Sequence, residues 1–306
     1  MAPQWAADVE LDADLAARLI AERFPPLSSL GVEPFGSGWD NAAFLVGGEF
    51  VFRFPRRELG AALLRNELRA LPFLAPRLPL PVPVPEFAGR PGNDYPYVFA
   101  GYRMLAGRTS CQVKWEPEAR ANNADRLGLF LSALHSIPIS GEVAAWAPRD
   151  EIRRADIPYR APILQRRIEE LPALPAGLDR TALMGRIEAL ASSPPPSEPG
   201  RWVHGDLYAR HLLVDRREEL CGVIDWGDAH LGDRALDLSI VYTFLPPEAR
   251  GKFWDRYGVV DAATRDRARF RALHYGAILM AYGSDVGDGD ILRVGEDALR
   301  FAMIGD

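Results

Sequence analysis

Residues 202–228 read WVHGDLYARHLLVDRREELCGVIDWGD, and this stretch says most about the fold. Two short β-prone runs, 212–214 and 221–224, flank a charged turn at residues 215–219. This pattern predicts a β-hairpin, because apolar runs that are separated by a short polar turn pair with each other. Polar residues lie before the first run and directly after the second. The hairpin therefore brings both polar groups to one edge.

Asp206, His211 and Asp225 are the side chains that this hairpin is expected to gather. Asp206 ends the tripeptide His-Gly-Asp at 204–206, His211 precedes the first strand, and Asp225 follows the second. Two carboxylates and an imidazole at strand ends suit a divalent metal ion and a proton acceptor. The segment therefore predicts a catalytic site.

A second hairpin is predicted nearer the N-terminus. Residues 42–46 and 50–54 are β-prone runs that are separated by Gly-Gly-Glu at 47–49, and two glycines favour a tight turn. Side chains alternate between the two faces of a strand. The phenylalanines of the second run therefore share one face, and Arg53 points away from them.

Glu67 is the unusual residue of a predicted helix over 60–71. It lies four residues after Leu63 and four before Leu71, on the apolar stripe of that helix. A carboxylate in that position is costly to bury unless a cation pairs with it. We therefore expect Glu67 to have a cationic partner.

The order of elements indicates an α+β protein of two lobes with a ligand cleft between them. β signals dominate the first part, and helical patterns follow at 124–136, at 179–191 and through most of the last sixty residues. An amphipathic helix is also expected before Pro25, with Asp12 or Asp14 as its cap. The alternating prolines at 79–85 have the composition of a stiff polyproline-like linker.

Composition excludes several classes of protein. The net charge of −6 argues against a non-specific nucleic-acid binder, and no apolar stretch is long enough to span a membrane. Two cysteines far apart in sequence exclude a disulfide scaffold. We see no signal peptide, so a cytoplasmic location is expected. The oligomeric state cannot be inferred from the sequence.

The segment at 202–228 resembles the catalytic segment of the aminoglycoside phosphotransferase family, which has a protein-kinase-like fold. His-Gly-Asp at 204–206 is intact, and Ile-Asp-Trp at 224–226 follows at the family's spacing. A downstream Gly-Asp-x-x-x-Asp-Leu element matches at 232–238. The family's usual asparagine is replaced by His211, as in macrolide phosphotransferases. His211 is then either a metal ligand or a hydrogen-bonding brace.

The resemblance continues upstream. The run Gly36-Ser37-Gly38 resembles the loop that covers the nucleotide phosphates. Arg53 occupies the place of the family's phosphate-pairing lysine, and only Lys114 and Lys252 are lysines in this chain. Glu67 matches the helix glutamate that holds that cation, which agrees with its independent need for a partner. Residues 97–107 resemble the strand and hinge that seat the purine, with site residues Tyr102, Arg103 and Leu105.

The resemblance implies a bilobal fold with a nucleotide-binding lobe at 1–104 and a catalytic and acceptor-binding lobe at 105–306. Asp206 would then accept the proton of an acceptor hydroxyl, and Asp225 would bind Mg²⁺. Arg53 would clamp the phosphates of ATP or GTP. By its offset from Gly107, Tyr102 is expected at the mouth of the predicted purine pocket, and its bulk there suggests that GTP is used at least as well as ATP.

Three functions remain open at this point. The first is a kinase of an aminoglycoside- or macrolide-like antibiotic, which would confer resistance. The second is a metabolic small-molecule kinase with a sugar or amino-alcohol acceptor. The third is a nucleotide-binding module without turnover. The sequence does not identify the acceptor or its hydroxyl.

Overall fold

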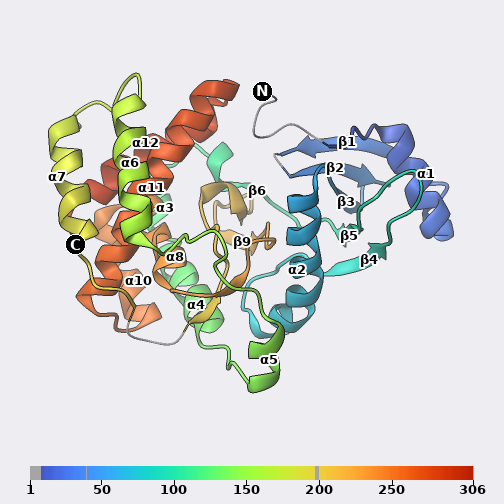
Figure 1. The fold of residues 1–306 in the computed structure, drawn as a ribbon, viewed down its shortest axis with the longest axis horizontal. Coiled ribbons are helices and arrows are strands. Elements are labelled where there is room, and N and C mark those ends of the chain that lie inside the picture. Colours follow the sequence, from blue (N-terminus) through green and yellow to red (C-terminus); the bar gives the residue numbers. More distant parts are fainter. Residues whose placement is uncertain (1–7, 39, 197–199, 306) are drawn as a thin grey trace. The chain divides into compact units, whose positions relative to one another are not determined.

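The structure is a computed structural model that describes residues 8–38, 40–196 and 200–305. Contacts within the chain define two compact units, and Figure 1 labels most of their elements. Unit 1 consists of the residues up to Pro76, Pro81–Leu105 and Asp225–Asp228. Unit 2 consists of Arg77–Leu80, Ala106–Ile224 and the residues from Ala229 onward.

The units are not continuous in sequence, in contrast to the predicted division at 104/105. Residues 225–228 follow the second strand of the hairpin predicted at 212–224 but pack with unit 1. Gly227 explains part of this packing, because a Cβ atom there would lie 3.2 Å from the Cβ of Leu63. The proline-rich stretch is also shared, since residues 77–80 belong to unit 2 and residues 81–85 to unit 1.

Unit 1 is built on an antiparallel sheet of five strands in the order β1-β2-β3-β5-β4. The hairpin predicted around residues 47–49 is present as β2 and β3. Leu45 pairs with Val51 and Val46 with Phe50 across this hairpin. The strands are β1 (Val32–Ser37), β2 (Asn41–Val46), β3 (Phe50–Pro55), β4 (Pro85–Gly89) and β5 (Phe99–Arg103).

The core of unit 1 is aromatic. Phe52 and Phe54 of β3 have no exposed surface, whereas Arg53 between them is partly exposed, as the alternation predicts. Phe54 stacks on Phe99 with ring centroids 4.6 Å apart. Aromatic burial of this kind contributes a large apolar area. It fixes the face on which Arg53 lies.

Two helices complete unit 1, namely α1 (Ala13–Arg23) and α2 (Glu58–Leu74). Asp12 caps α1 by accepting a hydrogen bond from the backbone N–H of Leu15 at 2.8 Å. The helix α2 contains the predicted segment 60–71 and buries Glu67 completely. Gly60 allows α2 to approach Asp40, because a Cβ atom there would lie 2.5 Å from the Asp40 carbonyl oxygen.

Unit 2 contains short strands and many helices. A three-stranded sheet has the order β6-β8-β9, and β7 pairs with β10. The strands are β6 (Arg108–Thr109), β7 (Arg201–Val203), β8 (Leu212–Val214), β9 (Leu220–Val223) and β10 (His230–Gly232). The helices are α3 (Pro117–Ala121), α4 (Ala124–His135), α5 (Gly141–Trp146), α6 (Ile157–Glu170), α7 (Arg180–Ala191), α8 (Ala235–Leu238), α9 (Ile240–Thr243), α10 (Arg250–Tyr257), α11 (Ala262–Val286) and α12 (Gly289–Met303). Short 3₁₀ helices lie at Pro25–Leu27, Ala75–Arg77, Ser110–Gln112, Ala209–His211 and Pro247–Ala249.

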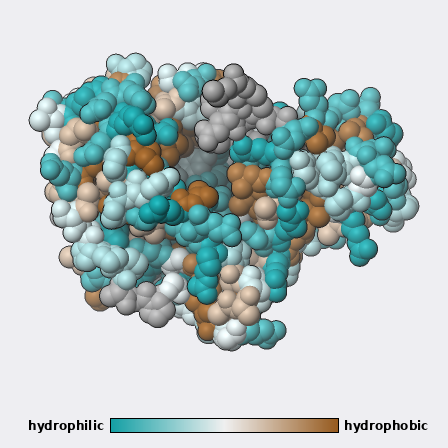
Figure 2. Space-filling view, in the orientation of Figure 1, coloured by the Kyte–Doolittle hydropathy of each residue, from teal (hydrophilic) through white to brown (hydrophobic). Residues whose placement is uncertain are grey.

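The α+β class is confirmed, with the sheet first and the helical region after it. The hairpin predicted at 212–224 and the helices predicted at 124–136 and 179–191 are present as β8–β9, α4 and α7. Hydrophilic residues cover most of the face in Figure 2, and apolar residues form smaller patches. Within the described ranges, no helix has the length and apolar character needed to cross a membrane.

Candidate active site

The His-Gly-Asp tripeptide forms a tight turn after β7. Gly205 has a φ of 83°, a backbone conformation that favours glycine. His204 is buried, and its Nε2 lies 3.0 Å from the carbonyl oxygen of Ile224. The N–H of Asp206 donates to His204 Nδ1 at 3.3 Å. His204 therefore braces the turn, and burial lowers the pKa of its imidazole.

The carboxylate of Asp237 on α8 stabilises the same turn. Its carboxylate accepts hydrogen bonds from the backbone N–H groups of His204 at 2.7 Å and Gly205 at 2.9 Å. His135 contacts it at 3.1 Å. Burial alone would raise the pKa of this carboxyl, but His135 and His204 outweigh that effect, and the pKa lies below its ordinary value. Asp237 is therefore an ionised support for the loop.

Asp206 and His211 lie together, as the hairpin predicts. The Nδ1 of His211 lies 2.7 Å from the backbone carbonyl oxygen of Asp206. A carbonyl oxygen can only accept, so Nδ1 carries the proton and Nε2 is the acceptor atom of the neutral ring. This arrangement is the one found in metal-binding histidines, and it also braces the loop. The geometry is compatible with both predicted roles.

Asp206 has a further partner that the sequence did not suggest. The hydroxyl of Tyr275 on α11 donates to Asp206 Oδ1 at 2.8 Å. Burial and the charge of Asp206 raise the pKa of the Tyr275 phenol well above its ordinary value, so it stays a donor. Tyr208 stacks on Tyr275 with ring centroids 5.8 Å apart. One carboxylate oxygen of Asp206 is thus fixed in place.

Arg53 forms the ion pair that Glu67 requires. Its Nη1 contacts the two carboxylate oxygens of Glu67 at 2.8 and 3.1 Å. Its Nη2 donates to Asp225 Oδ1 at 2.8 Å. The guanidinium therefore bridges the fully buried carboxylate of Glu67 on α2 and the carboxylate of Asp225, which follows β9. All three residues belong to unit 1.

The charges of this triad are strongly coupled. Burial by itself disfavours the charged form of Arg53, but Glu67 and Asp225 outweigh it and raise the pKa of the guanidinium above its ordinary value. Burial raises the pKa of the Glu67 carboxyl, and Arg53 opposes that shift. A permanent cation is therefore held at the place where the family pattern expects a phosphate-binding lysine.

The backbone of Asp225 has an unusual conformation. Its φ is 65°, in the left-handed region that few non-glycine residues adopt. Such conformations are concentrated at functional sites. Its side chain is 43% exposed, so part of the carboxylate remains accessible while Oδ1 contacts Arg53.

The site residues predicted on β5 occupy different environments. Tyr102 is buried, and its phenol lies near Arg53 and Glu67; burial and the Glu67 carboxylate raise its pKa well above the ordinary value. Its side chain is therefore turned into unit 1 and not toward an open pocket mouth. Arg103 forms exposed ion pairs with Glu49 and Glu86.

The predicted phosphate loop lies at the connection of β1 and β2. Gly36 and Ser37 are the last residues of β1, and the N–H of Gly38 donates to the Asn41 carbonyl at 2.9 Å. Trp39 in this loop lies outside the described residues. Leu105 is half-buried at the end of unit 1, and the preceding Met104 donates its N–H to Glu49 O at 2.8 Å.

The donor set fits Mg²⁺ that is shared with a nucleotide. Within the described ranges, no group of three His, Cys, Asp or Glu side chains is arranged to hold a metal alone. Mg²⁺ is commonly held by one or two carboxylates together with substrate phosphates and water. The partly exposed Asp225 is a carboxylate of that type. His211 offers a nitrogen, which Mg²⁺ favours less than oxygen.

Substitution of Arg53 and Glu67 is expected to show coupling. Arg53→Ala should raise the nucleotide KM about tenfold or more, because one charged hydrogen-bonding group is lost. Glu67→Gln should cause part of the same loss, since it releases the guanidinium. A double-mutant cycle on nucleotide affinity should give an interaction energy of about 1–3 kcal/mol.

A control for this cycle is the pair Arg120–Asp297 in unit 2, with a separation of 2.9 Å and an arginine that is also mostly buried. Arg120→Ala and Asp297→Asn should lower the melting temperature and leave the nucleotide affinity unchanged. Additive effects of Arg53→Ala and Glu67→Gln would show that this ion pair has no functional role.

Comparison with known proteins shows the family and the fold of the chain. Residues 31–273 match the model of the phosphotransferase enzyme family. A structure of APH(2")-IIIa with GDP and kanamycin has a TM-score of 0.68 and 25% identity, and the match covers 94% of this chain and 97% of the other. No curated protein sequence matches the chain.

Two further solved structures show the same fold. The GDP complex of aminoglycoside 2'-phosphotransferase-IIIa has a TM-score of 0.71, 24% identity and coverage of 96% and 99%. The macrolide 2'-phosphotransferase MphH from Brachybacterium faecium, solved as an apoenzyme, has a TM-score of 0.61, 24% identity and coverage of 94% and 98%.

The fold and the family match define a kinase-like phosphotransferase. The chain belongs to the phosphotransferase enzyme family, in agreement with the resemblance found in its sequence.

Proposed function

We propose that this protein transfers the γ-phosphoryl group of a nucleoside triphosphate to a hydroxyl group of a small molecule. The observation that carries the proposal is the pair of preorganised carboxylates, Asp206 held by Tyr275 and Asp225 held by Arg53. Phosphoryl transfer has a loose transition state, so positioning and charge neutralisation supply most of the catalysis. Both tasks need fixed polar groups of this kind.

Asp206 would orient the acceptor hydroxyl and accept its proton as the new O–P bond forms. Tyr275 occupies Oδ1, which leaves Oδ2 as the oxygen that meets the hydroxyl. The proton passes to this carboxylate, and the nucleoside diphosphate leaves with the electrons of the broken P–O bond. His204 and Asp237 keep the loop in place for this step.

Arg53 would bind the nucleotide phosphates while Glu67 fixes its orientation. Its present contact with Asp225 is then exchanged in part for phosphate oxygens, which suit its planar fork. Backbone amides at residues 36–38 would cover the phosphates. Asp225 would hold Mg²⁺, which would neutralise charge on the phosphates. His211 is a second ligand if it binds metal and does not only brace the loop.

The purine would contact the end of β5 and the residues that follow, including Arg103 and Leu105. We expect GTP to be used at least as well as ATP, although the side chain of Tyr102 is buried in unit 1 and gives this expectation no support. The relatives described with GDP make this expectation reasonable.

The acceptor class has two candidates. A hydroxyl of an aminoglycoside or macrolide antibiotic is supported by the relative solved with kanamycin. A metabolic acceptor is supported by the concentration of buried arginine on α11 in unit 2. The presence of both Asp206 and Asp225 argues against a nucleotide-binding module without turnover.

The proposed function is tested by triphosphate consumption. A panel of hydroxylated antibiotics and metabolites should be assayed with ATP and with GTP, and phosphorylated product should be identified by mass spectrometry. Acceptor-dependent release of diphosphate with a product heavier by one phosphate supports transfer. Tight nucleotide binding without turnover on any acceptor would favour the binding module, and a strong preference for ATP would reject the expectation for GTP.

A further inference from the structure

The region behind Asp206 is positively charged. Arg271 lies one helical turn before Tyr275 on α11, and its Cζ is 4.2 Å from the centroid of the Tyr275 ring. Both side chains are buried, with 7% and 4% of their surface exposed. A guanidinium therefore lies one aromatic side chain away from the proposed catalytic carboxylate.

Arg271 lacks the carboxylate partner that a buried cation normally has. Across the described ranges it forms no ion pair, and its Nε has no hydrogen-bond partner. Arg267 on the same helix shows the usual solution, with Nε 2.7 Å from Asp233. Burying a charge costs several kcal/mol unless an opposite charge accompanies it. Burial lowers the pKa of the Arg271 guanidinium, but Tyr275, followed by Asp206 and Asp150 at longer range, outweighs it and raises the pKa above its ordinary value.

Two more arginines reinforce the charge. Arg160 and Arg167 lie two turns apart on α6, which packs against α11. In the part of the chain that the structure describes, neither forms an ion pair with a carboxylate. Arg160 donates from Nε to the Arg153 carbonyl at 3.0 Å and from Nη2 to the Ile152 carbonyl, and burial, followed by the charge of Arg271, lowers the pKa of its guanidinium. Positive charge thus exceeds negative charge here, although the whole chain carries −6.

His274 lies in the same region of excess positive charge. It is 2% exposed, and neither ring nitrogen has a hydrogen-bond partner in the described structure. Burial, followed by Arg271, Arg160 and Arg167, lowers its pKa well below the ordinary value. A neutral imidazole with two unsatisfied nitrogens is itself costly to bury. The cluster therefore combines excess positive charge with unused hydrogen-bonding capacity.

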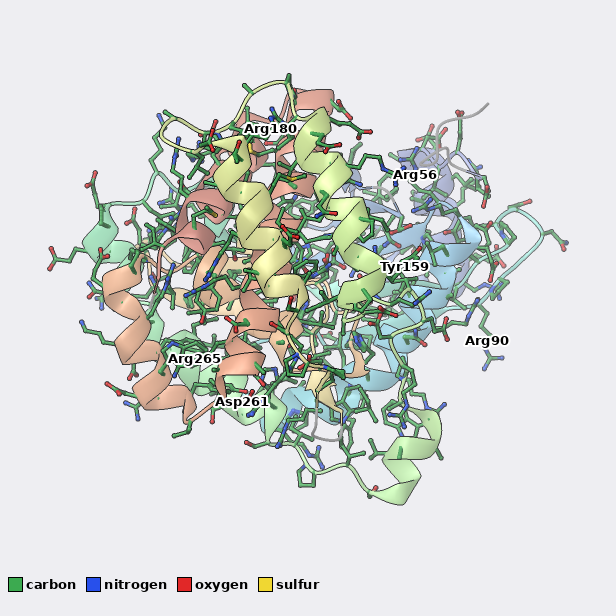
Figure 3. The ribbon with its side chains drawn as sticks, turned by 60° about the vertical axis from the view of Figure 1, so that its left-hand side comes forward. Arg56, Arg90, Tyr159, Arg180, Asp261 and Arg265 are labelled. Atoms are coloured by element: carbon green, nitrogen blue, oxygen red, sulfur yellow. The ribbon has the colours of Figure 1, made fainter. Side chains whose placement is uncertain are left out.

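The open side of the cluster is near Arg160. Arg160 is half-buried, and the neighbouring Tyr159 is 44% exposed with its ring centroid 5.4 Å from the Arg160 Cζ. Figure 3 shows Tyr159 at the lower end of α6, with Arg180 near the opposite end. A cavity beside Arg154 and Arg271 measures only about 10 Å³, room for one water. A ligand group would therefore approach past Arg160.

We propose that Arg160, Arg167 and Arg271 form an oxyanion-binding subsite, and that the acceptor is a hydroxyl compound that carries a carboxylate or phosphate group. This inference rests on the proposed function. An anion here would supply the partner that Arg271 lacks, at a distance of one side chain from the reacting hydroxyl. A polycationic aminoglycoside would meet repulsion at the same place.

The subsite is tested first without turnover, by calorimetric titration of the protein with inorganic sulfate. Arg160→Gln and Arg167→Gln should each weaken sulfate binding about tenfold, the value of a charged hydrogen bond. The control is Arg166→Gln, which removes an exposed arginine from α6 and should leave binding unchanged. Arg53→Ala should also leave it unchanged, which excludes the nucleotide site. Equal binding by wild type and both subsite variants would overturn the proposal.

The source of the oxyanion is settled by competition. A non-hydrolysable triphosphate should leave sulfate binding intact if the subsite serves the acceptor. Displacement of sulfate by the triphosphate analogue but not by the diphosphate would assign the site to the transferred phosphoryl group and overturn the proposal on the acceptor.

The acceptor itself is tested with matched pairs such as glucose and glucuronate, or glycerol and glycerate, with glucosamine and kanamycin as cationic compounds. The kcat/KM should be about tenfold or more higher for the anionic member of a pair, and Arg160→Gln should remove that preference. A preference for cationic acceptors would overturn the inference. Failure of the proposed function is distinct, because no acceptor would then be phosphorylated while sulfate binding remained.

Discussion

Asp206→Asn is expected to lower kcat by on the order of 10³-fold while the nucleotide dissociation constant changes less than about twofold. The asparagine keeps the size of the side chain and an oxygen that accepts from Tyr275, so the loop should stay in place. It cannot accept the proton of the acceptor hydroxyl. The loss corresponds to about 4 kcal/mol of transition-state stabilisation.

Single-turnover measurement with saturating nucleotide and acceptor separates chemistry from product release for this variant. Asp215→Asn provides a matched control, since Asp215 lies in the turn of the same β8–β9 hairpin and accepts local hydrogen bonds from the backbone N–H groups of Arg217 and Glu219. Its rate should be that of the wild type. A single-turnover rate of Asp206→Asn close to wild type would remove Asp206 from the proton-accepting role.

Local patterns were sufficient to predict the elements that carry the site. The glycine pair at 47–48 and the alternating phenylalanines predict β2 and β3, because turn chemistry and side-chain alternation are short-range effects. The position of Glu67 predicts a cationic partner, because a carboxylate on the apolar stripe of a helix needs one when it is buried. The structure supplies Arg53 at 2.8 Å. The loop of Asp206 likewise follows from short spacings.

Contacts between distant residues were not predictable in the same way. Arg53 pairs with Asp225, which is 172 residues away, and no local pattern connects them. Tyr102 was expected at a pocket mouth, but the buried carboxylate of Glu67 lies on the side to which its phenol turns. Pairing across β3 and β5 determines that orientation, and a strand read alone does not reveal it.

The charged environment of Asp206 was missed although the sequence contains a signal for it. The run at 265–271 places arginine at every second position inside what is otherwise a strongly apolar helix. In a helix, positions two residues apart lie on different faces, so some of these arginines must be buried. Arg267, Arg269 and Arg271 are indeed buried on α11. Buried arginine in this number indicates ion pairs or a ligand.

Asp225→Asn is expected to weaken the binding of the Mg²⁺-nucleotide complex at least tenfold, which is about 1.4 kcal/mol. Asparagine is suited to this test, because it tolerates the left-handed backbone at φ 65° better than alanine does. The substitution removes the charge without adding backbone strain. Turnover should fall further than binding, because the same charge is required to hold the metal during transfer.

The metal-free measurement decides how this loss arises. Asp225 repels the nucleotide phosphates when no cation is present, and it also engages one nitrogen of Arg53 at 2.8 Å. Asp225→Asn should therefore bind metal-free nucleotide as tightly as the wild type or more tightly, while it binds the Mg²⁺ complex more weakly. Calorimetric titrations with Mg²⁺ and with a chelator give both affinities. An equal loss under the two conditions would mean that Asp225 supports the fold around Arg53 and holds no metal.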